Sequence, residues 1–293
     1  NVPIKEILKY VDWKPFFEAW ELFGNYPEIL NDKLVGSAAK DLWNDANKMI
    51  QKIIKEKLTV PKCVFGFWPA NSDGDDVIIF ESEKRNKILK KFFFLRQQVS
   101  RKNSKRPNFC LADFIAPIGT KDDFIGGFLV TAGKGVEKLA TKYENNNDDY
   151  NSILVKSIGD RIAEAFAEML HQKVRKKYWG YSKKENLTNK ELIAEKFDGI
   201  RPAPGYPACP DHTEKETLFE LLKVSNNLKV KLTESFAMTP TSSVSGLYFA
   251  NPAANYFGIG KVFKDQIKDY AKRKKLDLEI VEKWLGPNLG YAP

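Results

Sequence analysis

The stretch from Arg201 to Lys215, RPAPGYPACPDHTEK, constrains the fold more than any other part of this chain. Four of its first ten residues are proline, and each proline fixes its own φ and moves the preceding residue away from helical conformation. We therefore expect an extended, stiff ribbon. Such a ribbon, with Arg201 at one end and Gly205-Tyr206 in the middle, suits a small ligand, because the guanidinium binds a carboxylate while the backbone and the tyrosine ring can contact a base.

Several strings of this chain resemble the C-terminal activation domain of cobalamin-dependent methionine synthase. They are Arg-x-x-x-Gly-Tyr at 201–206, VDWKPFFEAW at 11–20, LADFIAP at 111–117, DRIAEAFAEMLH at 160–171, KLTESFAM at 231–238 and WLGPNLGY at 284–291. The resemblance covers essentially the whole chain and implies one activation domain over residues 1–293. Because the chain opens on Asn1 and not on methionine, we expect a C-terminal fragment of a longer multidomain enzyme.

The bulk composition is that of a folded globular protein. A hydrophobic fraction of 43% and an aromatic fraction of 13% over 293 residues are enough for a sizeable core in one large domain. No stretch approaches the roughly 18 to 20 apolar residues that a membrane span needs. Three widely spaced cysteines do not form a disulfide framework in a chain of this size. We therefore expect a cytoplasmic protein in a reducing environment, with no membrane segment.

The formal charge of +9 is concentrated in one run. From Lys84 to Arg106 there are ten basic residues and no acidic one, so the run carries +10 and the rest of the chain about −1. Three interpretations stay open. The run is a nucleic-acid patch whose phenylalanines 92–94 stack on bases, an element with buried phenylalanines and solvated lysines, or a docking patch for an acidic protein. A basic adaptor without a small-molecule site is thus the alternative function.

The pattern of apolar residues predicts an α+β fold, in which a twisted antiparallel sheet is surrounded by helices. Three- and four-residue spacing predicts helices at 29–57, 149–178, 264–274 and 278–285. Short apolar runs bounded by turn residues predict strands at 63–70, 76–80, 108–115, 124–132, 243–250 and 255–262. Capping-box spacing marks helix starts at Thr188 and Thr213. Because the strands arrive in hairpins, the sheet is expected to be antiparallel.

The sequence offers little for acid–base, nucleophilic or metal chemistry. Only two histidines exist, and neither is accompanied by a Gly-x-Ser-x-Gly elbow or another evident nucleophile. Cys209 and His212 have metal-like local spacing, but a zinc site needs three or four ligands. We therefore predict no catalytic residue and no metal site.

The residues of the ribbon suit S-adenosylmethionine, a zwitterionic amino acid that carries a sulfonium, a ribose and an adenine. Arg201 is the candidate partner of the ligand carboxylate, with a structural salt bridge as its alternative. Ala203 to Tyr206 offer backbone groups, and Gly205 removes the side chain that would block close approach. Tyr206 is placed to pack on the ligand. A purely structural tight turn is the alternative for this segment.

Two carboxylates and one aromatic pair complete the predicted site. The resemblance implies that Asp12 and Glu164 face the ligand; from the residues alone, Asp12 is equally a helix N-cap, and either Glu164 or Glu168 faces solvent. Tyr256 and Phe257 fall in the last predicted hairpin, where alternation lets only one side chain face a given groove. Family members commonly have tyrosine at the second of these positions, so Phe257 lacks a hydroxyl.

The resemblance implies a function for the whole set. Such a module holds S-adenosylmethionine for the reductive methylation of inactive cob(II)alamin, which is bound mainly by an upstream cobalamin domain of the same polypeptide. A flavoprotein reductase supplies the electron and docks through Lys84 to Arg106, because the flavin domains of such partners are typically acidic. The parent enzyme transfers methyl from methyltetrahydrofolate to homocysteine, and this fragment is expected to bind its ligand without turnover.

Overall fold

The computed structural model describes residues 2–100 and 107–293, and its centre is a five-stranded antiparallel sheet. The strand order is β3-β2-β1-β4-β7. The bounds of the strands are β1 (Lys62–Asp73), β2 (Asp76–Phe80), β3 (Ile88–Phe93), β4 (Asp123–Thr131) and β7 (Ser243–Tyr248). A two-stranded ribbon, β5 (Lys231–Leu232) and β6 (Met238–Thr239), lies beside it. The predicted α+β class and the antiparallel sheet are confirmed.

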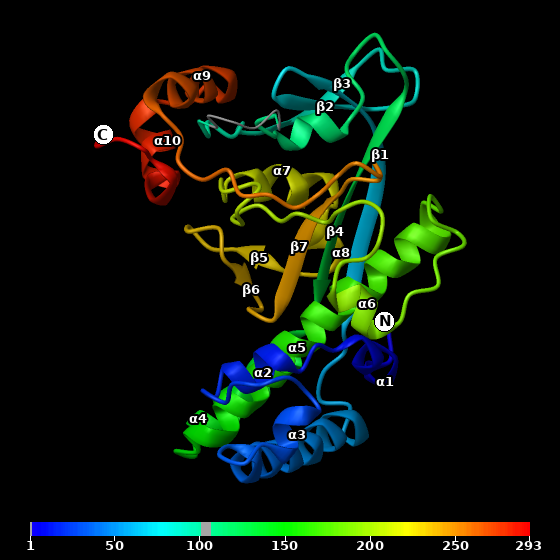
Figure 1. The fold of residues 1–293 in the computed structure, drawn as a ribbon, viewed down its shortest axis with the longest axis vertical. Helices are drawn as coiled ribbons and strands as arrows, with labels where there is room; N and C mark the ends of the chain where they lie inside the picture. The colour runs from blue at the N-terminus through cyan, green and yellow to red at the C-terminus, as the bar shows by residue number, and fades with distance from the viewer. Residues whose placement is uncertain (1, 101–106) are drawn as a thin grey trace.

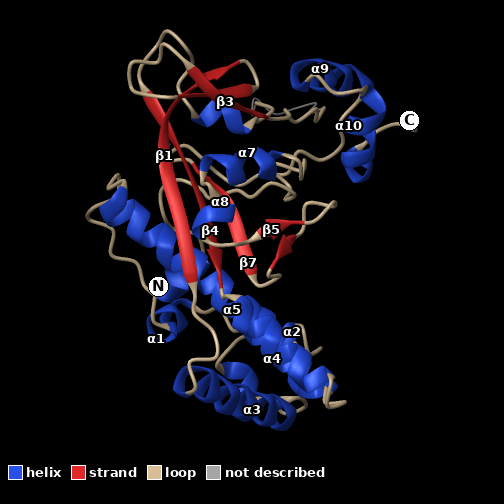
Figure 2. Ribbon diagram, turned by 180° about the vertical axis from the view of Figure 1, so that it is seen from behind, coloured by secondary structure: helices blue, strands red, loops and turns tan. Residues whose placement is uncertain are grey.

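Helices gather at the two ends of the elongated molecule (Figure 1). At one end lie α1 (Ile4–Ile7), α2 (Lys14–Glu18), α3 (Gly36–Lys55), α4 (Lys134–Glu144) and α5 (Asp149–Lys173). At the other lie α9 (Lys264–Lys274) and α10 (Leu278–Trp284), which Figure 2 shows from behind. The remaining helices are α6 (Asn189–Ile193), α7 (Glu214–Leu221) and α8 (Val224–Asn227). Within the described residues, no helix combines the length and apolar character needed to cross a lipid bilayer.

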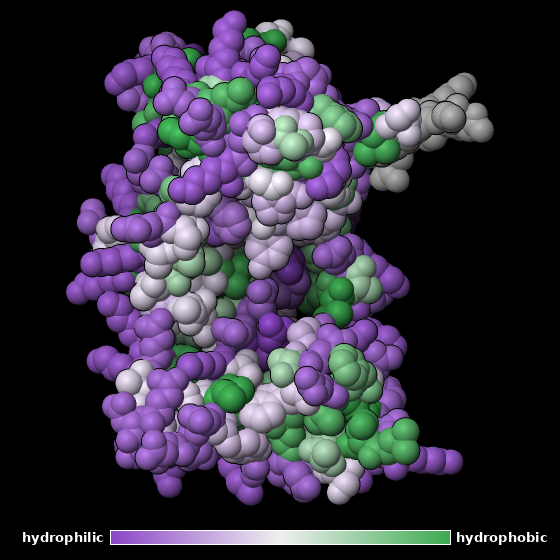
Figure 3. All heavy atoms as spheres, turned by 90° about the vertical axis from the view of Figure 1, so that its left-hand side faces the viewer, coloured by the Kyte–Doolittle hydropathy of each residue, from purple (hydrophilic) through white to green (hydrophobic). Residues whose placement is uncertain are grey.

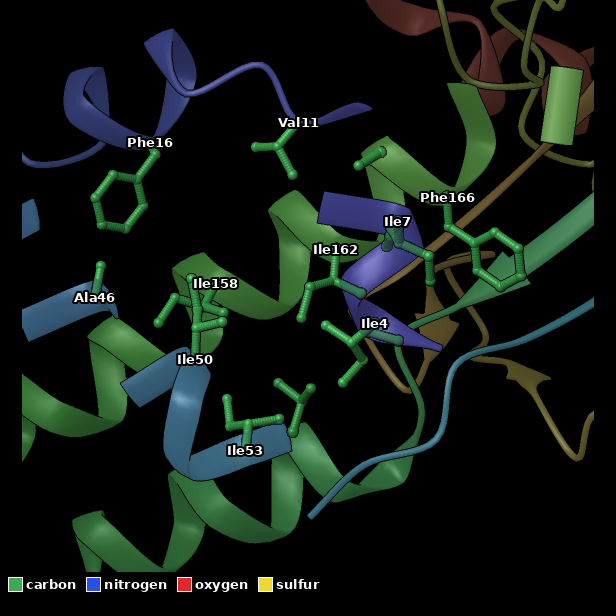
Figure 4. Close-up of a cluster of buried hydrophobic side chains, with 14 of the residues drawn as sticks. Ile4, Ile7, Val11, Phe16, Ala46, Ile50, Ile53, Ile158, Ile162 and Phe166 are labelled. Atoms are coloured by element: carbon green, nitrogen blue, oxygen red, sulfur yellow. The ribbon is translucent and has the colours of Figure 1, made fainter. Parts of the chain in front are cut away.

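Strand alternation divides the core between the two faces of the sheet. On β4, Phe128 and Val130 join the cluster on the α5 side, whereas Ile125 and Leu129 join the cluster that includes Leu218 of α7. The α5 side is packed by α1 and α3, whose isoleucines meet Ile158 and Ile162 (Figure 4). Each such fully buried side chain contributes about 1.5–3 kcal/mol. The helix α5 is therefore fixed rigidly against the sheet.

The predicted helices are largely confirmed. The 149–178 segment is α5, capped by Asp148, whose carboxylate accepts from Asn151 N at 3.0 Å, and it ends in a π-helical turn, Val174–Tyr178. The 29–57 helix begins later than expected, at Gly36, because Glu28–Asn31 forms a separate 3₁₀ turn. The Thr188 capping box forms. The Thr213 box does not, since its hydroxyl accepts from Lys274 Nζ instead.

Two predicted strands are wrong. In 108–115 the backbone turns into a 3₁₀ helix at Leu111–Phe114, because the Asp113 carboxylate accepts from Cys110 N at 2.9 Å and closes the turn. In 255–262 the backbone donors go elsewhere than to β7: Ile259 N donates to Pro207 O and Val262 N to Asn288 O. Apolar alternation was present in both segments, but it does not reveal where the backbone hydrogen bonds go.

Candidate functional site

The proline ribbon continues the main sheet for three residues and then turns. Ile200 and Phe249 exchange backbone hydrogen bonds of 3.0 Å, and Pro202 O accepts from Leu247 N at 2.8 Å. The chain then folds back, with Gly205 N donating to Cys209 O at 2.7 Å. The expectation of an extended backbone is correct only up to Ala203. The turn that follows leads the chain away from β7 and exposes Tyr206 and Pro207, whereas Ala208 and Cys209 stay buried.

Gly205 is required for the shape of this turn. Its φ is +94°, and a Cβ there would lie 2.3 Å from the His212 ring. Both facts exclude an ordinary side chain. Gly205 itself does not line the cavity described next, although its neighbours do. The structure therefore supports a conformational role for this glycine, and its close approach to a ligand stays a prediction.

A cavity of about 490 Å³ opens where the ribbon leaves β7. Most of its wall is apolar and aromatic, and its ionisable groups come from α5, the segment after α6, and the ribbon. The lining residues are Phe128, Glu164, Glu195, Arg201, Pro202, Ala203, Tyr206, Pro207, Ala208, Val244, Ser245, Tyr256 and Phe257. Figure 3 shows the molecule hollowed about midway along its length, with hydrophilic residues inside the hollow. A chamber of this size suits a small molecule with an apolar ring.

A second cavity of about 270 Å³ shares Glu164, Glu195 and Arg201 with the first. It adds Asp12, Glu168 and Arg161, so that four carboxylates and two guanidinium groups surround it. The two cavities thus differ in chemistry: one is largely apolar, and the other is charged, with carboxylates in excess. Together they match a ligand with an apolar ring at one end and positive charge at the other.

The Arg201 guanidinium is held by α5 at the boundary of the two cavities. Its Nη2 donates to Glu168 Oε2 at 2.7 Å, and its Nη1 lies 3.2 Å from His171 Nδ1. The side chain is 19% exposed and lines both cavities. The predicted salt bridge and the predicted access to a ligand therefore coexist, because a guanidinium has five N–H donors.

The carboxylates at the two cavities differ in burial and in hydrogen bonding. Burial raises the pKa of Glu164, although its side chain keeps contact with solvent at the cavity wall, and burial likewise raises the pKa of Glu195. Asp12 accepts from Lys14 N at 3.0 Å, and α2 begins at Lys14 with Trp13 at its N-cap. Asp12 is therefore one residue too early for the predicted N-cap role. Its side chain lies at the wall of the acidic cavity.

The aromatic residues around the cavity do not follow the predicted alternation. Tyr256 and Phe257 both contribute to the wall, because their segment is a loop and not a strand. The Tyr256 hydroxyl accepts from Arg201 N at 3.0 Å, and Phe257 packs its ring against Phe109 and Phe114. Tyr206 is 61% exposed at the wall. The packing of Phe257 shows that a ring at this position serves the core as well as the cavity.

Sequence reasoning missed several residues of the wall. Glu195 lies just after α6, and no local pattern marks it as a site residue. Ser245 is 2% exposed, and within the described residues its hydroxyl has no hydrogen-bond partner. The alternation of β7 places Ser245 in a buried strand but does not indicate a cavity beside it. Among the described residues, no group of three or more His, Cys, Asp or Glu side chains is arranged to hold a metal ion.

The described part of the basic run fits the second of its three interpretations, an element with buried phenylalanines and with lysines at the surface. Phe92 and Phe94 are buried, and five of the six described basic residues form ion pairs with carboxylates from other segments. These residues are Arg85, Lys87, Lys90, Lys91 and Arg96. The remaining cations at 101, 102, 105 and 106 lie outside the described residues. Burial of the phenylalanines excludes stacking by Phe92 and Phe94 on bases.

Comparison with known proteins agrees with this geometry. The family model described as "Vitamin B12 dependent methionine synthase, activation domain" matches residues 3–275, so the chain belongs to this family. A solved structure, described as the MetH reactivation domain bound to AdoHcy, is 50% identical with a TM-score of 0.97. The alignment covers 99% of this chain and 89% of that one. The chain is thus the activation domain of a methyltransferase, the vitamin B12-dependent methionine synthase, and the adaptor alternative is not favoured.

Proposed function

We propose that the paired cavities bind S-adenosylmethionine and that the domain thereby supports the reductive methylation of inactive cobalamin. The observation that carries the proposal is the arrangement of Arg201 between an apolar chamber and an acidic one. Each part of the ligand finds a chemically matched wall. The AdoHcy bound to the 50%-identical reactivation domain supports the assignment, because AdoHcy is the same molecule without the transferred methyl group.

The residues then have separate roles. Arg201 binds the ligand carboxylate, since its remaining N–H donors face the cavities that it lines. Glu164 and Glu195 lie beside both chambers and stabilise the ammonium and sulfonium charges. Asp12 accepts from a ligand amine or hydroxyl within the acidic cavity.

The ribbon and the loop after β7 bind the nucleoside part. Ala203 and Tyr206 line the apolar chamber and offer backbone groups and a ring, while Gly205 keeps the turn in shape. Tyr256 and Phe257 close the opposite wall. The adenine is thereby enclosed between aromatic and aliphatic side chains, which is the environment that a planar base prefers.

In this proposal the domain contributes to the methyl transfer by positioning the methyl donor. Cobalamin bound by a neighbouring domain of the same polypeptide would supply the methyl acceptor once one electron had reduced it, and S-adenosylmethionine held at Arg201, Glu164 and Tyr206 would leave as AdoHcy after losing its methyl group. An in-line displacement of this kind is accelerated mainly by holding the two centres in line. The cavity walls carry carboxylates, two guanidinium groups and hydroxyls, which suit binding and orientation.

The electron donor in this proposal is a flavoprotein reductase. We do not assign the described part of the Lys84 to Arg106 run as its docking surface, because five of its six cations are already ion-paired.

We further propose that residues 1–293 form one domain of a longer enzyme, and that this domain alone binds its ligand without turnover. Its three cysteines are free, which supports a place in the reducing cytoplasm.

Calorimetric titration of the domain with S-adenosylmethionine tests the ligand assignment directly. We expect saturable binding with one site per chain. A titration without saturable heat, together with no ligand-induced rise in unfolding temperature, would contradict the assignment. An unchanged affinity in Arg201→Ala would contradict the role given to Arg201 without contradicting the ligand assignment.

A further inference from the structure

His171 is a buried histidine that faces the guanidinium of Arg201. It lies on α5, three residues after Glu168, and its side chain is 0% exposed. Its Nδ1 is 3.2 Å from Arg201 Nη1. Because a guanidinium only donates, Nδ1 is the acceptor, and the ring proton is on Nε2, 3.4 Å from the Tyr181 hydroxyl.

Two aromatic rings hold the imidazole in this orientation. Tyr248 stacks on it at 5.1 Å with an interplanar angle of 17°, and Phe197 meets its face edge-on at 4.9 Å. Burial, with the charges of Arg201 and Arg175, keeps the pKa of His171 well below its ordinary value. The imidazole is therefore neutral at physiological pH and offers a fixed lone pair to Arg201.

Glu168 completes the support of the guanidinium. Its Oε2 accepts from Arg201 Nη2 at 2.7 Å, so two residues one helical turn apart hold the two terminal nitrogens of Arg201. A guanidinium held at both ends cannot turn about its last side-chain bonds without losing one of these contacts. No other side chain hydrogen bond of this guanidinium is found within the part of the chain that the structure describes, so its remaining donors are available to the cavities.

We propose that His171 is a positioning residue for the ligand carboxylate, which it does not touch: it fixes the direction in which Arg201 presents its free donors. This rests on the proposed binding of S-adenosylmethionine. Glu168 supplies the charge that neutralises Arg201, and His171 supplies direction without adding a second negative charge. A rigid supporting group of this kind keeps the binding group in the productive geometry.

Two variants of His171 separate the lone pair from the packing. His171→Phe keeps a flat ring between Tyr248 and Phe197 but removes the acceptor, whereas His171→Asn places an amide oxygen near the position of Nδ1. Both are titrated with S-adenosylmethionine and with 5′-methylthioadenosine, which has the same nucleoside but lacks the amino-acid chain with its carboxylate and ammonium, and also the sulfonium charge. Unfolding temperatures of the ligand-free variants show whether each variant is folded.

We expect His171→Phe to weaken S-adenosylmethionine binding about tenfold, as for the loss of one oriented charged contact. The affinity for methylthioadenosine should stay within about twofold of that of the unmodified domain. His171→Asn should recover most of the loss. Equal weakening of both ligands would show a structural role and overturn the proposal, as would unchanged S-adenosylmethionine affinity in a folded His171→Phe protein. If the unmodified domain binds methylthioadenosine but not S-adenosylmethionine, the proposed function itself is wrong, and this inference with it.

Discussion

The proline ribbon and the basic run are the two segments that the sequence marks most strongly, and the fold treats their charges in opposite ways. Arg201 is held by Glu168 and His171 at a cavity wall, with donors left for a ligand. In the basic run, Arg96 forms ion pairs with both Asp75 and Asp113 at 2.6 and 2.7 Å. A cluster of charge in the sequence is therefore no guide to free charge on the surface.

The two regions meet at the start of α7, where the ribbon ends. Glu214 Oε2 accepts from Phe93 N at 3.0 Å, and its Oε1 accepts from Lys274 Nζ at 2.6 Å. Lys274 also donates to Asp211 at 2.7 Å. This buried cluster joins α9 and β3 to the segment that ends the ribbon. The ribbon is thus fixed at one end by the sheet and at the other by charge.

The largest effect is expected at Arg201. Arg201→Ala should weaken S-adenosylmethionine binding on the order of 100-fold, because charge-assisted hydrogen bonds are worth about 1.5–3 kcal/mol. The matched control is Arg96→Ala, in which another ion-paired arginine is removed from the basic run. Calorimetry should show that the affinity of the control for S-adenosylmethionine lies within about twofold of that of the unmodified domain. Equal losses in the two variants would remove the contrast between the regions.

The second-largest effect is expected for Gly205→Ala. The positive φ and the 2.3 Å approach to His212 both oppose a Cβ, so we expect about 1–3 kcal/mol of destabilisation and weaker ligand binding. Gly119→Ala is the control, because Gly119 has φ +79° with nothing within 4 Å. Denaturant unfolding measures the unfolding free energy of the two variants. A Gly205→Ala protein no less stable than Gly119→Ala would show that the turn adapts.

Glu164→Gln tests the acidic chamber. Removing one negative charge should weaken S-adenosylmethionine binding by roughly three- to tenfold and AdoHcy binding less, because only the former carries a sulfonium. The ratio of the two affinities is the measurement. An unchanged ratio would place Glu164 away from the sulfonium, and Glu195→Gln would then be the variant to compare.

The buried Glu214 side chain, at the junction of the two regions, should make the unfolding free energy depend on pH. Burial raises its pKa to about 7 from the usual 4.5, so the folded state binds a proton more tightly than the unfolded state. Stability from this group is therefore full below pH 4.5 and is lost as pH rises through about 7. Glu214→Gln should flatten this part of the curve of unfolding free energy against pH. A curve that keeps its slope would contradict the assignment.

The smallest effect is expected in the basic run. Lys90 pairs with Glu220, and both side chains are substantially exposed at 41% and 59%, so Lys90→Ala should change the unfolding free energy by about 0–1 kcal/mol. S-adenosylmethionine affinity should not change. Denaturant unfolding at low and high salt is the measurement. A large loss of ligand affinity would show that the two regions are coupled through α7.

The sequence by itself determined the class of the fold, the long helix, the hairpin of β1 and β2, and the stiffness of the ribbon at its start. These depend on periodicity and on proline, which act over a few residues. The resemblance of its motifs to one family brought together Asp12, Glu164, Arg201, Ala203, Gly205, Tyr206, Tyr256 and Phe257, and the structure places seven of these eight at the two cavities.

Only the tertiary structure decided the rest. It turned the 108–115 run into a 3₁₀ turn that Asp113 closes locally, and it turned the 255–262 run into a loop whose backbone donors reach Pro207 and Asn288. It brought Glu195 and Ser245 to the cavity wall: Glu195 lies only six residues before Arg201, but no local pattern marks it, and Ser245 lies on a separate strand. It also neutralised most of the described basic run with carboxylates from β1, α7 and the loops. Pairing of charges and backbone groups depends on distances in space, which local patterns do not contain.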